Sequence, residues 1–90
     1  MPATVRVSGT LRALMDGRDE VSAPGQTVAE VIGNLDASFP DLSAKLLDGR
    51  GARRFVNIFV NQTDIRRLDG INTPVESGDE IYIIAGVAGG

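Results

Sequence analysis

A single amphipathic helix pattern stands between segments with strand patterns, and this arrangement limits the fold more than any other feature. Thr27-Val28-Ala29-Glu30 predicts the start of the helix, because the Thr hydroxyl can accept from the Glu30 N–H while the Glu side chain reaches back. Pro40 ends it, because the residue before a proline is pushed away from helical geometry. One apolar stripe at helical spacing must then be buried against a sheet: Val28, Val31, Ile32, Leu35 and Phe39.

Strand patterns lie on both sides of this helix, and the segment richest in β-branched and aromatic residues is 55–60. The expected strands are residues 4–8, 19–23, 55–60, 64–66 and 80–85. Leu42, Leu46 and Leu47 predict a short second helical turn, and residues 49–51 predict a mobile loop. The order β, β, α, β, short β, β, with the first and last strands as central neighbours, predicts an α+β β-grasp. This fold has a mixed sheet with one main helix packed on one face.

Size and composition indicate one folded domain. Ninety residues allow a single core, and 42% apolar with 23% charged residues is typical of a globular chain. We expect residues 1–84 to form the β-grasp domain and residues 85–90 to form a flexible C-terminal tail.

Charge and residue types exclude several classes of function. A net charge of −3 argues against binding to nucleic acid or to an anionic membrane. The absence of Cys and His removes thiolate nucleophiles, the commonest general base and the commonest metal ligand, so we expect no catalytic residue and no metal site. No apolar run is long enough to span a membrane and the N-terminus lacks a signal pattern, so we expect a cytoplasmic protein.

Strand alternation separates a covered face of the sheet from an open one. Aliphatic residues of the third and last strands should meet the helix, whereas Phe59, Tyr82 and Ile84 should lie on the face that no helix covers, with Phe55 and Asn57. An exposed apolar group of this kind indicates a partner surface. The alternative is that single exposed apolar residues are common and carry no function.

The sequence closes on the tail "AGVAGG". Chain ends are often disordered and tolerate small residues, which is one explanation. The other is that the terminal carboxylate is the working group. Gly89 and Gly90 lack Cβ atoms and fit a narrow channel, and six extended residues reach up to ~20 Å.

Three stretches occur in a fixed order along the chain: "RRFVNIFVNQTDIR", "ESGDEIYII" and the terminal "AGVAGG". Together they resemble the ubiquitin-like sulfur carriers of the ThiS/MoaD superfamily, which share the β-grasp fold. The likeness runs nearly end to end and is greatest to the carriers that supply sulfur for cysteine synthesis (CysO type). The small subunit of molybdopterin synthase follows closely. Gly86 stands where related tails often carry Pro, so we expect a looser tail root.

The resemblance implies a carrier that is not an enzyme and binds no cofactor of its own. An E1-like, MoeB-type adenylating enzyme uses ATP to join AMP to the carboxylate of Gly90, and a sulfur source then displaces AMP and leaves a thiocarboxylate. Val87, Ala88 and Gly89 enter the partner's active site with it. The sulfur passes to an accepting synthase, either a cysteine-synthase-like enzyme or the molybdopterin synthase large subunit.

Two other functions stay open. A covalent protein modifier would join the same activated carboxylate to a lysine amine, and a plain binding module would use its apolar face and leave the tail idle. Asn57 and Asn61 are interpreted as structural residues that order a turn. The arginine doublets at 53–54 and 66–67 are expected to serve solubility, with a rim contact to an acidic partner as the alternative.

Overall fold

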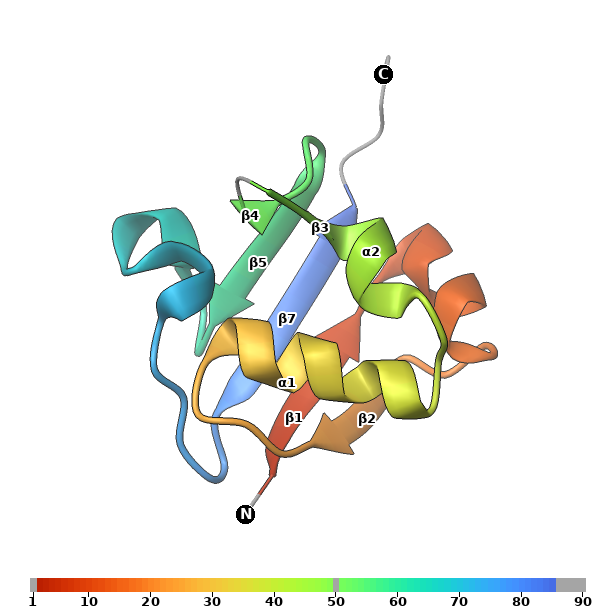
Figure 1. Cartoon of the computed structure of the whole chain (residues 1–90), viewed down its shortest axis with the longest axis horizontal. Coiled ribbons are helices and arrows are strands. Elements are labelled where there is room, and N and C mark those ends of the chain that lie inside the picture. The colour runs from red at the N-terminus through yellow and green to blue at the C-terminus, as the bar shows by residue number, and fades with distance from the viewer. Residues whose placement is uncertain (1, 50, 86–90) are drawn as a thin grey trace.

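The computed structural model describes residues 2–49 and 51–85, and its centre is a five-stranded mixed sheet (Figure 1). The strands lie in the order β2-β1-β7-β5-β6; β1 and β7 pair in parallel and the other neighbours pair antiparallel. The first and last strands are therefore central neighbours, which confirms the predicted β-grasp. The strands of this sheet are β1 (Ala3–Val7), β2 (Glu20–Ala23), β5 (Val56–Val60), β6 (Thr63–Asp64) and β7 (Glu80–Ala85).

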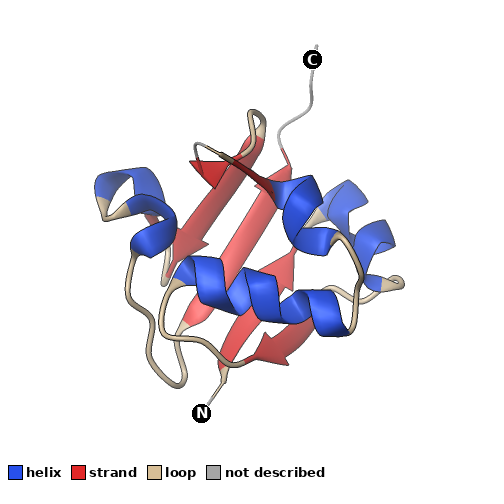
Figure 2. Cartoon of the chain, in the orientation of Figure 1, coloured by secondary structure: helices blue, strands red, loops and turns tan. Residues whose placement is uncertain are grey.

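The main helix, α1 (Val28–Asn34), crosses one face of the sheet, as Figure 2 shows. The hydroxyl of Thr27 caps it by accepting from the Glu30 N–H at 3.2 Å. The Glu30 side chain also reaches back, as predicted, but its carboxylate accepts from the N–H of Gln26 at 3.0 Å and not from the N–H of Thr27. The predicted helix also tightens before Pro40, into the 3₁₀ turn η2 (Leu35–Ala37). The short second helix is confirmed as α2 (Leu42–Leu46).

The core lies between α1 and the covered face of the sheet. Val28, Val31 and Ile32 of the helix stripe are fully buried. Alternate residues of the central strands meet them, and the strand residues buried on this face are Ala3, Val5, Val7, Ile58, Val60, Ile81 and Ile83. The period of two that the sequence shows therefore assigns the covered face correctly.

Three segments differ from the expectation. Strand β5 begins at Val56, because Phe55 lies in a turn with φ 74° that the Val56 N–H closes on the Arg53 carbonyl at 2.9 Å. The strand predicted at residues 64–66 ends at Asp64, whose carboxylate accepts from the Arg66 N–H at 2.8 Å and starts the 3₁₀ turn η3 (Ile65–Arg67).

The third difference lies at Gly51, which was predicted to belong to a mobile loop over residues 49–51. Gly51 instead begins a short strand, and a small hairpin pairs β3 (Leu47–Asp48) with β4 (Gly51–Ala52). Leu47 and Ala52 pack against the core, and this contact holds the two short strands together. Two further 3₁₀ turns, η1 (Gly9–Met15) and η4 (Gly70–Asn72), complete the connections.

The tail predicted over residues 85–90 falls almost wholly outside the described residues. Only Ala85 is placed, as the last residue of β7, opposite Val56 of β5. The predicted tail residues Val87, Ala88, Gly89 and Gly90 lie outside the described part of the chain, and so does Gly86.

Candidate functional site

The face of the sheet opposite α1 carries the apolar group predicted from strand alternation. Phe59 and Tyr82 are directly opposite each other on β5 and β7, and Ile84 is opposite Asn57. All three apolar side chains are half-buried. The residues between and beside them on the strands are buried in the core: Ile58, Val60, Ile81 and Ile83. The three half-buried side chains therefore share the other face. We call Phe59, Tyr82 and Ile84 the open face.

Ion pairs border the open face on both sides. Arg6 is opposite Tyr82 on β1, and its guanidinium contacts the Glu20 carboxylate at 2.5 Å and the Glu80 carboxylate at 3.5 Å. On the other side the Arg66 guanidinium contacts the Asp64 carboxylate at 2.7 Å. Exposed pairs of this kind add little stability, so their main effect is to hold charged groups around an apolar centre. An apolar centre with a polar rim is typical of a protein-binding surface.

The open face leads directly to the start of the tail. Ile84 immediately precedes Ala85, the last strand residue, and β7 is a central strand with partners on both sides. The body of the protein therefore fixes the position of residue 85 to that of the open face.

A network of polar side chains ties the opposite end of β7 to β5. The Asn61 amide nitrogen donates to Asp79 Oδ1 at 3.0 Å, and the Asn61 amide oxygen accepts from the Glu80 N–H at 3.0 Å. Asp79 Oδ2 also accepts from the Glu76 N–H at 2.8 Å. The hydrogen bond from Asn61, and then the one from Glu76, lowers the pKa of Asp79 below its ordinary value.

The same network identifies structural and missed residues. Asn61 and Gln62 both have positive φ, at 48° and 75°, as a tight hairpin turn requires. This confirms the structural interpretation of Asn61. Asn57 accepts from the Arg66 guanidinium at 3.1 Å, so it orders Arg66 and not the turn. Asp79 was missed as the acceptor, although the Gly-Asp step before the last strand signalled it.

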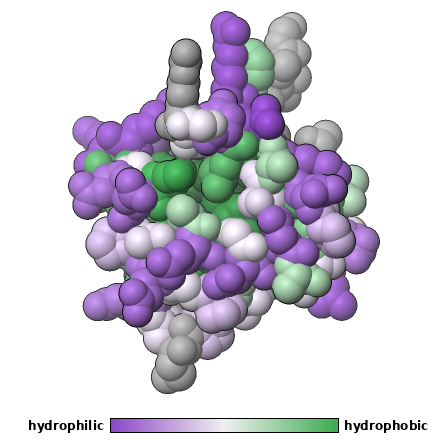
Figure 3. Space-filling model, in the orientation of Figure 1, coloured by the Kyte–Doolittle hydropathy of each residue, from purple (hydrophilic) through white to green (hydrophobic). Residues whose placement is uncertain are grey.

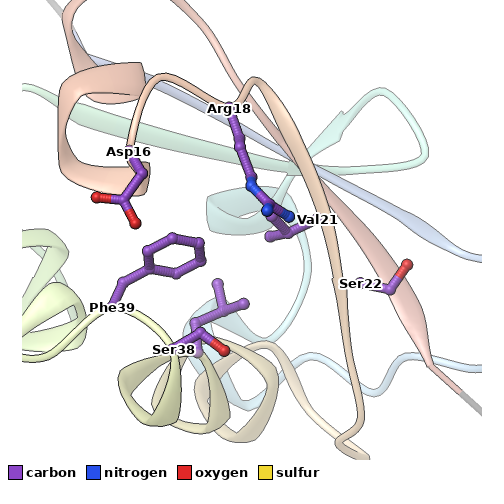
Figure 4. Close-up of a pocket in the computed structure, with 7 residues that line it drawn as sticks. Asp16, Arg18, Val21, Ser22, Ser38 and Phe39 are labelled. Carbon is purple, nitrogen blue, oxygen red and sulfur yellow. The ribbon is translucent and has the colours of Figure 1, made fainter.

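A separate hollow of about 330 Å³ lies beside β2, and Figure 4 shows its lining. The Asp16 carboxylate lies near the ring of Phe39, and the Arg18 guanidinium lies beside Val21 (Figure 4). Strand β1 separates β2 from β7, so this hollow is remote from the root of the tail. Its one acid and one base have no neighbouring nucleophile other than the Ser22 and Ser38 hydroxyls.

Residues 2–49 and 51–85 contain neither a metal-binding cluster nor a membrane-spanning helix. In this part of the chain no three His, Cys, Asp or Glu side chains are grouped so that they could hold a metal ion. No helix in the same ranges combines the length and the apolar character needed to cross a bilayer.

Several known proteins are similar to this chain in sequence and in structure. The sulfur carrier protein CysO of Mycobacterium tuberculosis is 39% identical over the full length of both chains. The crystal structure of the Amycolatopsis orientalis BexX/CysO complex contains a chain with a TM-score of 0.89 and 34% identity, covering 98% of this chain and 99% of that one. Small archaeal modifier protein 3 of Haloferax volcanii is 31% identical over 71% of this chain and 70% of its own.

A family model gives the assignment directly. The model of the ThiS family matches residues 5–90, which include all five strands of the main sheet except the first residues of β1. The alignment with the mycobacterial carrier covers the same span and the first four residues. The chain belongs to the ThiS family.

Proposed function

We propose that this protein is a sulfur carrier whose terminal Gly90 carboxylate is converted to a thiocarboxylate and donates sulfur, most directly for cysteine synthesis. The observation that carries the proposal is the 39% identity, over the full length of both chains, to the sulfur carrier protein CysO. The alignment spans the whole chain and therefore covers the diglycine end on which the proposed chemistry depends.

The proposed chemistry follows from the weakness of a carboxylate as an acyl donor. A carboxylate oxygen of Gly90 attacks the α-phosphorus of ATP in the active site of an E1-like enzyme, and pyrophosphate leaves. A sulfide then attacks the carbonyl carbon; the C–S bond forms, and the C–O bond to AMP breaks with its electron pair on AMP. Gly90 is left as a thiocarboxylate, whose sulfur is a softer nucleophile than oxygen. The carrier supplies the acyl group and the partner supplies the catalysis.

The folded domain and the tail have different tasks in this proposal. The open face contacts the partner, because Phe59, Tyr82 and Ile84 form an apolar centre with a charged rim next to Ala85. Residues Val87, Ala88 and Gly89 carry Gly90 into the partner's active site, as small side chains allow. The accepting partner is a cysteine-synthase-like enzyme, and the BexX/CysO complex of Amycolatopsis orientalis supports the docking of a chain of this kind on a second protein.

Intact-protein mass spectrometry tests the proposal. The full chain is incubated with the E1-like enzyme of its source organism, ATP and sulfide, beside a matched chain that lacks Gly89 and Gly90. We expect the full chain to gain the mass of one sulfur-for-oxygen exchange and the shortened chain to gain nothing. No gain by the full chain would reject the carrier and support the plain binding module, and an equal gain by both chains would place the sulfur elsewhere than on Gly90.

The covalent modifier is the second candidate, and the likeness to small archaeal modifier protein 3 supports it at lower identity and coverage. It predicts isopeptide adducts between Gly90 and lysines in cell extract. Adducts without any thiocarboxylate would replace the carrier by the modifier. Because the full-length identity favours the carrier, we place the modifier second.

A further inference from the structure

An exposed aromatic side chain stands where the chain enters β5. Phe55 is 48% exposed and has φ 74°. A bulky residue rarely adopts this left-handed conformation, and such strain in a well-formed turn is a pointer to function. This backbone conformation holds the Phe55 ring outside the core, whereas the neighbouring Val56 packs against the core. Burial therefore does not explain the presence of an aromatic residue at this position.

Three arginines line the same hollow as this ring. The Arg54 guanidinium lies 5.3 Å from the centroid of the Phe55 ring, within the range of a cation–π contact. Arg53 donates through Nε to the Ala44 carbonyl at 2.7 Å, and Arg66 is held by the carboxylate of Asp64. Hydrogen bonds and ring contact thus restrict all three side chains before any partner arrives, which lowers the entropy cost of binding.

These residues line one hollow of about 340 Å³ at the edge of the sheet. Its other lining residues are small or uncharged, and none of the described residues that form it is acidic: Gly51, Ala52, Val56, Asn57, Gly70 and Ile71. Figure 3 shows apolar surface between α1 and the β3–β4 hairpin, framed by hydrophilic side chains. On a chain with a net charge of −3, this edge carries an exposed ring and three guanidinium groups, of which that of Arg66 is paired with the Asp64 carboxylate.

The position of the hollow links it to the tail. Val56, which lines it, is opposite Ala85, the last residue of β7 (Figure 1). Arg66 also reaches the open face, because it donates to Asn57, the residue opposite Ile84. The hollow and the open face are therefore neighbouring surfaces, and both lie next to Ala85. One partner can contact both.

We propose that Arg53, Arg54, Phe55 and Arg66, which we call the basic edge, form a docking surface for an acidic rim at the active-site mouth of the adenylating enzyme. The proposal rests on the proposed function, since an adenylating enzyme binds this chain as a substrate only if Gly90 is activated. Guanidinium groups pair with carboxylates in a planar, two-pronged geometry, and the exposed ring fits an apolar depression between them. Because the chain is acidic overall, a local basic surface orients it toward an acidic partner and speeds encounter.

The test measures ATP–pyrophosphate exchange by the adenylating enzyme of the source organism against the concentration of carrier. Arg54→Glu and Phe55→Gly alter the basic edge, and glycine at position 55 also relieves the left-handed backbone. Arg18→Glu makes the same charge change beside the remote hollow and is the matched control. Circular dichroism confirms that each variant is folded.

We expect Arg54→Glu to raise KM about tenfold with kcat unchanged, because a contact made equally before and during reaction affects binding alone. Phe55→Gly should also raise KM, and Arg18→Glu should stay within about twofold. Added salt should raise KM more for the unaltered chain than for Arg54→Glu.

Three results would overturn the inference. Equal KM values for Arg54→Glu, Phe55→Gly and Arg18→Glu, with normal exchange, reject the basic edge and leave the proposed function standing. If the variants are defective only in sulfur transfer to the accepting synthase, the basic edge binds that synthase and not the adenylating enzyme. No exchange with the unaltered chain rejects the proposed function together with the docking surface.

Discussion

Replacing Asn61 with alanine tests whether the polar network at the start of β7 holds the body of the carrier together. The variant loses the hydrogen bonds to Asp79 and to the Glu80 N–H, both at 3.0 Å. It also places alanine at φ 48°, a left-handed conformation that asparagine tolerates better. The open face and the tail are untouched by the substitution, so stability and activation should respond separately.

The two hydrogen bonds and the backbone set the magnitude. Each bond contributes about 0.5–1.5 kcal/mol, and because Asn61 is exposed the lower half of that range applies, so the pair gives about 1–2 kcal/mol. The left-handed backbone adds about 1 kcal/mol for alanine. The free energy of unfolding should therefore fall by about 2–3 kcal/mol, which lowers Tm by roughly 8–24 °C in a domain of this size.

Urea denaturation followed by circular dichroism measures this change, because the chain has no Trp to report by fluorescence. Asn61→Gly is the matched variant: it loses the same bonds but accepts the left-handed backbone, so it should remain more stable than Asn61→Ala. A loss below about 0.5 kcal/mol for Asn61→Ala would refute the role given to the network, since that is the scatter of ordinary surface substitutions.

Further predictions concern the helix and the carboxylates. Gly25→Ala should destabilise by more than about 2 kcal/mol, because the added Cβ would lie 2.6 Å from the backbone nitrogen of Val31. Gly33→Ala meets nothing within 4 Å and should stabilise by about 0.5–1 kcal/mol, so thermal unfolding that ranks the two glycines equally would contradict the packing of α1. Thr27→Ala removes the helix cap and should cost about 1 kcal/mol in the same assay. The pKa of Asp64 is lowered by the side-chain hydrogen bond from Arg66 and that of Asp79 by Asn61. Their contribution to stability is present above the ordinary carboxyl pKa of 3.8 and is lost as pH falls through the lower folded value. Urea midpoints that stay constant from about pH 5 to about pH 2 would be inconsistent with both shifts.

The parts of the fold with long periodic patterns could be predicted from the sequence. The last strand was predicted with the bounds that the structure shows, Glu80–Ala85, because its alternation and the turn before it are both clear. The cap at Thr27 was predicted from residue types alone. The open face followed from the period of two, which needs no tertiary information.

The remaining parts depend on contacts between distant segments. The β3–β4 hairpin has two residues in each strand, too few to show a pattern, and forms because Leu47 and Ala52 pack on the core. Phe55 has strand-forming character, but a left-handed turn removes it from β5. The sequence shows the two arginine doublets but not that Arg66 and Arg54 line one hollow, because this depends on how η3 packs in the folded chain.

The central claim is that sulfur is carried on the terminal carbonyl of Gly90, and fragmentation of the loaded protein in a mass spectrometer tests it most directly. After incubation with the adenylating enzyme, ATP and sulfide, the C-terminal fragment that contains Gly89 and Gly90 should carry the whole sulfur-for-oxygen exchange. Fragments from the body of the protein should be unchanged. Sulfur on any internal fragment, or none on the C-terminal fragment, would contradict the account.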